Sequence, residues 1–197
     1  FQKGACAMFM EKALRAALES RKTRIIMLAS MGPVYLTGET FRGFDPARVT
    51  GDGLVLVDNP EIVDRWKVFE IGLRDTLRRI ERAGKTAVVV IDVPELGIEP
   101  QHCNPDEPRT CRNKRAEVDA RSGRYRRLVT EVTLKFSNSH VFDPTRLFCK
   151  KKFCMGTAHG KPLYRDVDHL SEDGSLLVGK HLGPFIRNLL AIERAAE

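Results

Sequence analysis

Residues 84–95 have the sequence GKTAVVVIDVPE, and this stretch decides the fold class. A glycine opens it, an unbroken apolar run fills residues 87–91, and an acidic segment with a proline closes it. An apolar run of this length without alternation is typical of a strand buried in a parallel sheet. Because ligands of such sheets bind beyond the carboxyl ends of the strands, Asp92 and Glu95 are candidates for substrate contact. The alternative interpretation is a turn aspartate and an exposed glutamate with no function.

The segments on either side of this strand alternate between helix and strand. Apolar periodicity predicts helices over residues 6–22, 60–83, 113–138 and 171–192. Apolar runs predict further strands over residues 24–29 and 140–143, and a short strand or hairpin arm over residues 54–57. A helical turn over residues 144–148 and a glycine-containing hairpin over residues 152–165 complete the pattern. This order predicts one α/β domain with a mainly parallel sheet.

The predicted helix over residues 113–138 combines an apolar stripe with many basic residues. Tyr125, Leu128 and Val132 belong to the stripe, and the arginines are expected on the exposed face. The whole chain has a net charge of +7, which suits nucleic acid, an anionic membrane or polysaccharide surface, or a plain solvated face. Aromatic residues make up only 7% and no nucleic-acid motif occurs, so we expect no nucleic-acid partner.

Four of the five cysteines form two close pairs, with seven and four residues between the members. Short loops bounded by cysteine are typical of disulfides in an oxidising compartment, so we expect the bonds Cys103–Cys111 and Cys149–Cys154. A zinc site is the alternative, although the spacings match no common zinc pattern. Its conceivable ligands are Cys149, Cys154, His159 and His169. Cys6 is left over, and we expect its partner before Phe1.

Residues 163–174, LYRDVDHLSEDG, place an aspartate three residues before a histidine. One helical turn or a tight loop brings positions i and i+3 to the same side, so Asp166 can reach Nδ1 of His169 and fix its tautomer. That is the orienting half of a hydrolase or acyl-transfer triad. The alternative is a surface aspartate that caps the final helix beside a solvated histidine. Ser171 is a second candidate for that N-cap.

These stretches resemble the SGNH (GDSL-like) hydrolase fold. They are most similar to the periplasmic SGNH domains fused to membrane acyltransferase-family-three proteins. The likeness depends on residues 26–35, 84–95 and 147–154, and most specifically on residues 162–171. The resemblance implies a three-layer α/β/α, flavodoxin-like fold with a mainly parallel sheet. It also implies a Ser-His-Asp triad in which Asp166 is the acid and His169 the base, with no metal or cofactor.

Two departures from the SGNH pattern concern the nucleophile and the oxyanion site. No Gly-Asp-Ser occurs, and none of the seven serines follows a strand that fits the first strand of the SGNH pattern. We therefore expect the nucleophile and the next glycine block to lie before Phe1. The segment after the strand over residues 24–29 contributes Ser30 and Gly32 as candidate oxyanion-loop residues. It contains no asparagine, and related domains often carry tryptophan in place of Gly32.

The resemblance implies an extracytoplasmic O-acyltransferase, tethered to the inner membrane and facing the periplasm. It would pass an acyl group, in the simplest case acetyl, onto a hydroxyl of a cell-surface glycan. The acyl donor would arrive through an upstream membrane acyltransferase domain. Two alternatives stay open: a secreted carbohydrate esterase, and a non-catalytic glycan- or membrane-binding module on a degenerate SGNH fold.

Overall fold

The computed structural model describes residues 5–43, 54–104 and 107–196. Its longer helices are α1 (Ala5–Glu19), α3 (Arg65–Arg82), α4 (Arg115–Thr133) and α6 (Glu172–Ala196). The short helices are α2 (Gly32–Thr37), α5 (Thr145–Phe148) and the 3-10 turns η1 (Phe41–Gly43), η3 (Pro100–His102) and η4 (Pro108–Thr110). The strands are β1 (Ile25–Ala29), β2 (Thr86–Val90), β3 (Arg112–Lys114), β4 (Ser139–Phe142), β5 (Phe153–Met155), β6 (Thr157–Ala158) and β7 (Lys161–Pro162).

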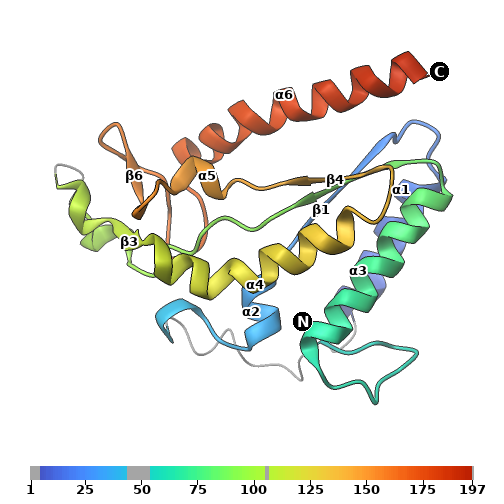
Figure 1. Cartoon of the computed structure of the whole chain (residues 1–197), viewed down its shortest axis with the longest axis horizontal. Coiled ribbons are helices and arrows are strands. Elements are labelled where there is room, and N and C mark those ends of the chain that lie inside the picture. The colour runs from blue at the N-terminus through green and yellow to red at the C-terminus, as the bar shows by residue number, and fades with distance from the viewer. Residues whose placement is uncertain (1–4, 44–53, 105–106, 197) are drawn as a thin grey trace.

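A parallel sheet in the order β1-β2-β4 forms the centre of the molecule (Figure 1). In its register, Val90 of the central strand lies between Ala29 and Phe142, so the three strands end at the same edge. The prediction of a mainly parallel α/β sheet is therefore confirmed.

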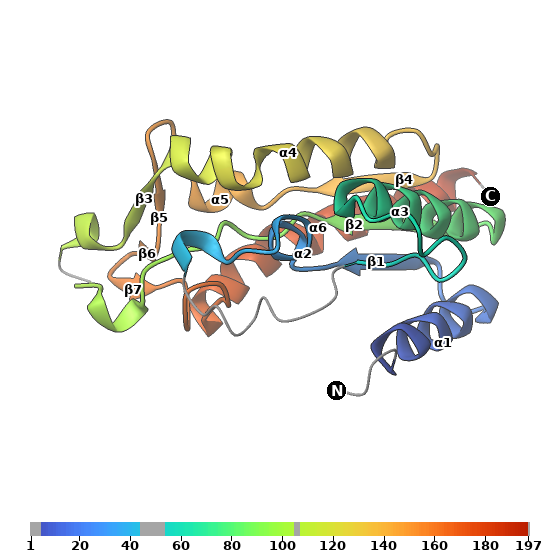
Figure 2. The same ribbon diagram turned by 90° about the horizontal axis from the view of Figure 1, so that it is seen from below.

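Helices cover the two faces of this sheet and make three layers. Helices α3 and α4 lie on one face and α6 on the other, as Figures 1 and 2 show. Ala87, Val89 and Ile91 pack into the core with α3 and α4, whereas Val88 and Val90 pack with α6. Because side chains alternate between the faces of a strand, two covered faces require an apolar residue at every position. This requirement explains the unbroken apolar run of β2.

Beyond the carboxyl edge of the sheet, the short pairs β3–β5 and β6–β7 form a small region of their own. A second buried cluster supports it and includes Leu96, Val118, Phe148 and Tyr164. The disulfides Cys103–Cys111 and Cys149–Cys154 lie in this region, with the pairing that the sequence predicts. The predicted hairpin over residues 152–165 is correct only for β6–β7, because β5 pairs with β3 instead.

Two predictions around α3 need correction. The helix begins at Arg65 rather than residue 60, because the Asp64 side chain accepts hydrogen bonds from the backbone N–H groups of Trp66 (2.9 Å) and Lys67 (3.4 Å). It ends before Gly84, whose positive φ of 65° suits glycine. Residues 54–57 form no strand, and the side chains of Val55 and Val57 are exposed there rather than buried in a sheet.

Helix α4 is shorter than the predicted helix over residues 113–138. Asn113 belongs to β3, where its buried side-chain amide donates to the carbonyl oxygens of Glu95 (3.2 Å) and Leu96. The expectation that all the arginines of this helix are exposed is wrong for Arg121, whose side chain is only 10% exposed. Its partner, described below, is a buried carboxylate.

In the described part of the chain, no helix combines the length and the apolar character needed to cross a membrane. The side chain of Cys6 lies outside the described residues, so its pairing stays a prediction.

Candidate active site

The segment over residues 163–171 is held against the loop that follows β2. Its two buried residues, Leu163 and Tyr164, pack in the cluster beyond the sheet edge. The Tyr164 hydroxyl donates to the carbonyl of Pro94 (2.6 Å), and the Leu96 N–H donates to the carbonyl of Val167 (2.7 Å). These bonds fix the segment at the carboxyl edge of the sheet, where ligands of parallel α/β proteins bind.

Within this segment, Asp166 and His169 form the contact that their spacing predicts. The two carboxylate oxygens of Asp166 lie 3.0 Å and 2.9 Å from Nδ1 of His169. Asp166 also accepts from the backbone N–H groups of His169 (2.7 Å) and Asp168 (3.1 Å). The alternative in which Asp166 caps the final helix is wrong, because Ser171 accepts from the Gly174 N–H (3.1 Å) and caps α6.

The electrostatics of this pair favour an ionised aspartate and an available Nε2. Burial raises the pKa of Asp166, but the hydrogen bonds from the backbone of His169 and Asp168 and from the His169 ring outweigh it and leave the pKa well below its usual range. An oxygen of Asp168 lies 3.1 Å from the same Nδ1. With Nδ1 engaged and the His169 side chain 48% exposed, Nε2 is the nitrogen that can exchange a proton with a substrate.

A buried ion pair joins the loop after β2 to helix α4. Arg121 binds Glu95 through Nε (2.6 Å) and Nη2 (3.1 Å), and the two side chains are 10% and 7% exposed. Arg121 also donates to Thr37 Oγ1 (2.8 Å) and the Glu39 carbonyl (2.7 Å), while Glu95 accepts from the Phe41 N–H (3.2 Å). The pair therefore ties the segment after α2 to the rest of the site.

Sequence reasoning missed this ion pair. The sequence predicts that Glu95 is either a substrate contact or an exposed glutamate, whereas the structure shows that it is buried. One signal was present: Arg121 stands four residues before Tyr125, on the same side of α4 as the apolar stripe. A basic side chain that is buried at such a position needs an acidic partner.

Asp92 occupies the carboxyl end of the central strand, where several carboxylates gather. Burial raises the pKa of Asp92 to about 7, and the neighbouring charges of Glu95 and Asp168 contribute in the same direction. The Val93 backbone and the charge of Arg121 oppose this rise only in part. Near neutral pH, Asp92 is therefore a mixture of carboxylic acid and carboxylate.

The segment after β1 differs from the expected loop, because Gly32 begins the short helix α2. A Cβ atom on Gly32 would lie 2.1–2.7 Å from ring atoms of Tyr125, so the buried tyrosine occupies the space that a side chain would need. The Tyr125 hydroxyl is hydrogen-bonded to the Ser30 side chain and to the backbone of Asp92, and burial raises its pKa to about 12. Among the hydrogen bonds of the described residues, none joins Ser30 or Gly32 to the Asp166–His169 pair.

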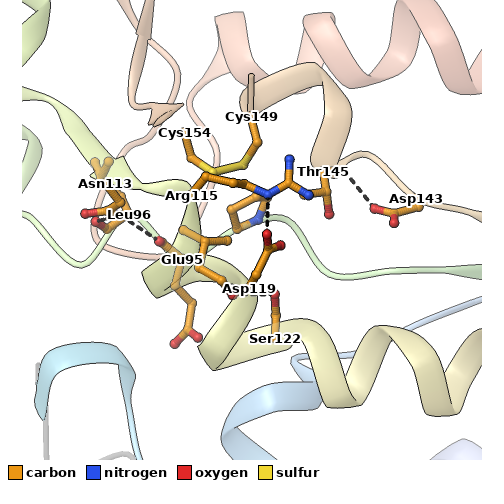
Figure 3. Close-up of a disulfide and its surroundings, with 12 residues drawn as sticks. Glu95, Leu96, Asn113, Arg115, Asp119, Ser122, Asp143, Thr145, Cys149 and Cys154 are labelled. Atoms are coloured by element: carbon orange, nitrogen blue, oxygen red, sulfur yellow. Dashed lines mark hydrogen bonds and ion pairs between the residues drawn. A yellow bond between two sulfur atoms is a disulfide. The ribbon is translucent and has the colours of Figure 1, made fainter. Parts of the chain in front are cut away.

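The disulfide Cys149–Cys154 lies in the same buried cluster as Leu96 (Figure 3). In this view Asn113 reaches Leu96, and the Glu95 carboxylate points away from the sulfur atoms. The zinc alternative is excluded for Cys149 and Cys154, because both are disulfide-bonded. Asp166, Asp168 and His169 bring potential ligand atoms within 4.8 Å of one another, and in this arrangement Asp166 is hydrogen-bonded to Nδ1 of His169.

A cavity of about 560 Å³ lies along the other side of α4. It is lined by Arg115, Asp119, Gly123, Arg126, Arg127, Thr130, Glu131 and Asp143. Arg126 binds Asp143 (2.7 Å) and Asp119 (3.3 Å), and Arg115 binds Asp119 (2.8 Å). The cavity contains none of the predicted site residues, so it is separate from the Asp166–His169 pair.

The fold has three layers and carries the Asp166–His169 pair at the edge of its sheet. Comparison of the chain with known protein families gives a match over most of its length. The family model described as "SGNH domain (fused to AT3 domains)" matches residues 1–184. The chain belongs to this SGNH family. A search of curated proteins finds no match to it.

Membership makes this SGNH domain an acyltransferase-associated module with chemistry of the hydrolase or acyltransferase type. Its two disulfides fit an extracytoplasmic domain, because such bonds persist in oxidising compartments. The roles of Asp166 and His169 in a triad, and of Ser30 and Gly32 in an oxyanion loop, stay predictions.

Proposed function

We propose that this SGNH domain transfers an acyl group, specifically acetyl, onto a hydroxyl of a cell-surface glycan in the periplasm. A membrane acyltransferase domain of the same polypeptide would deliver the acyl group. The observation that supports this proposal most directly is the contact of 2.9 Å between Asp166 and Nδ1 of His169 at the carboxyl edge of a parallel sheet. The family description, in which SGNH domains are fused to AT3 domains, supports the membrane partner.

In the proposed mechanism, Asp166 stays ionised and holds His169 in the tautomer with the proton on Nδ1. Nε2 then takes the proton of a serine hydroxyl, supplied from outside the described residues, as that oxygen attacks the acyl carbonyl. The imidazolium returns this proton to the leaving group of the donor, and the acyl group stays on the serine as an acyl-serine. A glycan hydroxyl repeats the sequence in the second half: it gives its proton to Nε2, attacks the acyl carbon, and the serine oxygen leaves with that proton.

The test is acyl transfer by the full-length protein in membrane vesicles, with a radiolabelled acetyl donor and a cell-surface glycan as acceptor. We expect O-acetylated glycan from the unaltered protein and a loss of at least about 10³-fold in the variant His169→Ala. His181→Ala is the matched control, because His181 is an exposed histidine on α6 away from Asp166. It should transfer acetyl at the unaltered rate.

The same assay separates the alternatives. Release of free acetate without glycan product, abolished by His169→Ala, would indicate an esterase. Glycan binding without release or transfer would indicate a binding module. Transfer that persists in His169→Ala would contradict the proposed triad.

A further inference from the structure

The loop between α5 and β5 is a tight turn that carries three lysines in succession. Cys149 and Cys154 close this turn twice, through a disulfide and through an antiparallel backbone bridge. Between them, the Lys150 N–H donates to the Phe153 carbonyl (2.8 Å). The backbone of the turn is therefore well fixed, while the lysines at residues 150–152 are exposed.

The β3–β5 pair beside this turn adds further positive charge. Asn113 and Cys154 lie opposite each other and are buried, so the neighbouring positions of both strands face outward. Lys114 lies opposite Phe153, and its side chain is 74% exposed. The guanidinium of Arg112 lies 3.8 Å from the centre of the Phe153 ring. We call the cations of this surface the basic hairpin: Arg112, Lys114, Lys150, Lys151 and Lys152.

Little negative charge offsets the basic hairpin. In the part of the chain that the structure describes, no ion pair includes a lysine at residues 150–152. Lys114 lies 3.9 Å from a carboxylate oxygen of Glu117, which is itself paired with Arg42 (2.6 Å). The basic hairpin therefore presents positive charge that the protein does not neutralise.

The basic hairpin lies at the end of the molecule that carries the candidate active site. Strands β3, β5, β6 and β7 lie together at this end, as Figures 1 and 2 show. The Gly156 N–H, directly after β5, donates to the Cys111 carbonyl (2.6 Å), and the Leu163 N–H donates to the Gly156 carbonyl (2.8 Å). Leu163 is the first residue of the segment that holds Asp166 and His169. A partner of the basic hairpin would therefore be held at the same end as this pair.

We propose that the basic hairpin docks this SGNH domain onto an anionic phospholipid membrane by binding the phosphates of lipid headgroups. The domains of this family are fused to AT3 domains, and a membrane domain on the same chain would hold the hairpin at a high effective concentration near the lipid. A lysine ammonium is a compact charge on a flexible stem. Several lysines therefore suit a fluid array of phosphates better than the fixed hydroxyl pattern of a sugar. Each lysine near an anionic surface strengthens binding about fivefold.

Docking would keep the Asp166–His169 pair at the end of the domain that is nearest the membrane. This placement suits a domain that receives its acyl group from a membrane domain, an interpretation that rests on the proposed function. The docking itself involves no acyl transfer, so it can be measured separately.

The test is amine labelling of the full-length protein in lipid nanodiscs, with a membrane-impermeant succinimidyl ester and mass spectrometry of each lysine. Nanodiscs of phosphatidylcholine alone are compared with nanodiscs of equal parts phosphatidylcholine and phosphatidylglycerol. In the anionic nanodiscs, labelling of residues 150–152 should slow by at least about fivefold, and high salt should remove this protection. Lys22, an exposed lysine before β1 at the amino edge of the sheet, is the control and should be labelled equally in both.

Two triple variants separate the effect of charge from that of shape, with Lys114 as the labelled reporter. The variant with Lys150→Gln, Lys151→Gln and Lys152→Gln lacks three charges, so Lys114 should be labelled at the same rate in both kinds of nanodisc. The variant with Lys150→Arg, Lys151→Arg and Lys152→Arg keeps these charges, so Lys114 should stay protected in the anionic nanodiscs.

Equal labelling of residues 150–152 in the two kinds of nanodisc would overturn the inference, even if a variant fails to fold. Protection by added polygalacturonate, an acidic polysaccharide, without protection by phosphatidylglycerol would overturn it in favour of a glycan site. Acyl transfer that persists in His169→Ala would instead overturn the proposed function and leave the labelling rates unchanged, so the two failures are distinguishable.

Discussion

Two loops at the carboxyl edge of the sheet use the same chemical group in opposite ways. The loop after β2 carries Glu95, which is 7% exposed and satisfied by Arg121 and a backbone N–H. The segment before α6 carries Asp166, which is 30% exposed and pairs with a half-exposed histidine. The backbone N–H of Leu96 donates to the carbonyl of Val167, so the two loops lie in direct contact.

The difference lies in access to water and in the partner of each carboxylate. The carboxylate of a buried bidentate pair cannot leave its arginine for another partner, because one charge would then be unpaired in the interior. A carboxylate beside an exposed imidazole can hold that ring while the other ring nitrogen takes and returns a proton. We therefore assign the loop after β2 mainly to stability and the segment before α6 to chemistry, with Asp92 at the boundary. Four predictions test this division.

The largest effect is expected for Asp166→Asn, measured as kcat of acyl transfer. The amide no longer selects the productive tautomer of His169, so the rate should fall about 10³–10⁴-fold. The amide oxygen can still accept from the backbone N–H groups of Asp168 and His169, so the unfolding free energy should change by only about 1 kcal/mol. A large loss of stability instead would show that Asp166 is structural.

The next effect is expected for Arg121→Met, measured by urea unfolding. Removal of the guanidinium leaves Glu95 buried and unpaired, so the unfolding free energy should fall by about 3–5 kcal/mol. Arg127→Met, on an exposed position of the same helix, is the control and should change it by about 0.5 kcal/mol or less. Adding Glu95→Met should recover part of the loss. A small effect of Arg121→Met would contradict the structural role of the pair.

A pH-dependent effect is expected for Asp92→Asn. The folded protein holds the Asp92 proton up to about pH 7, whereas an unfolded aspartate loses it near pH 4. The folded state therefore binds more protons in this window, and stability decreases as the pH rises through it. Relative to Asp92→Asn, the unaltered protein should lose about 2–3 kcal/mol of unfolding free energy between about pH 5 and about pH 8. Parallel stability curves would show that Asp92 ionises normally.

The smallest effect is expected for Ser171→Ala. Its hydroxyl accepts from the Gly174 N–H and donates to the Pro162 carbonyl (2.6 Å), so its loss should cost about 1 kcal/mol of unfolding free energy. Ser175→Ala, an exposed serine one turn later, should cost less than about 0.5 kcal/mol. Equal effects of the two substitutions would show that Ser171 does not cap α6.

Local patterns in the sequence were sufficient for the framework. The apolar run of β2, the periodicity of the helices and the glycine at residue 84 depend on neighbours along the chain, so each could be recognised without the fold. The same holds for Asp166 and His169, which are three residues apart, and for the two disulfides, whose cysteines are close in sequence. The sequence patterns gave wrong predictions at two places. A local apolar run resembled a strand at residues 54–57, and a proline resembled a helix start at residue 60.

Only the tertiary structure decided which charges are buried and which are free to act. Glu95 and Arg121 are separated by 26 residues, and no local pattern connects two charges at that distance. Asp92 acquires its raised pKa from Glu95, Asp168 and burial, which meet only when the sheet and its crossing helices are assembled. The physical reason is that sequence periodicity shows only which face of its own helix or strand a residue occupies. The pKa of a side chain depends instead on burial and on every charged or hydrogen-bonding group that the fold places around it.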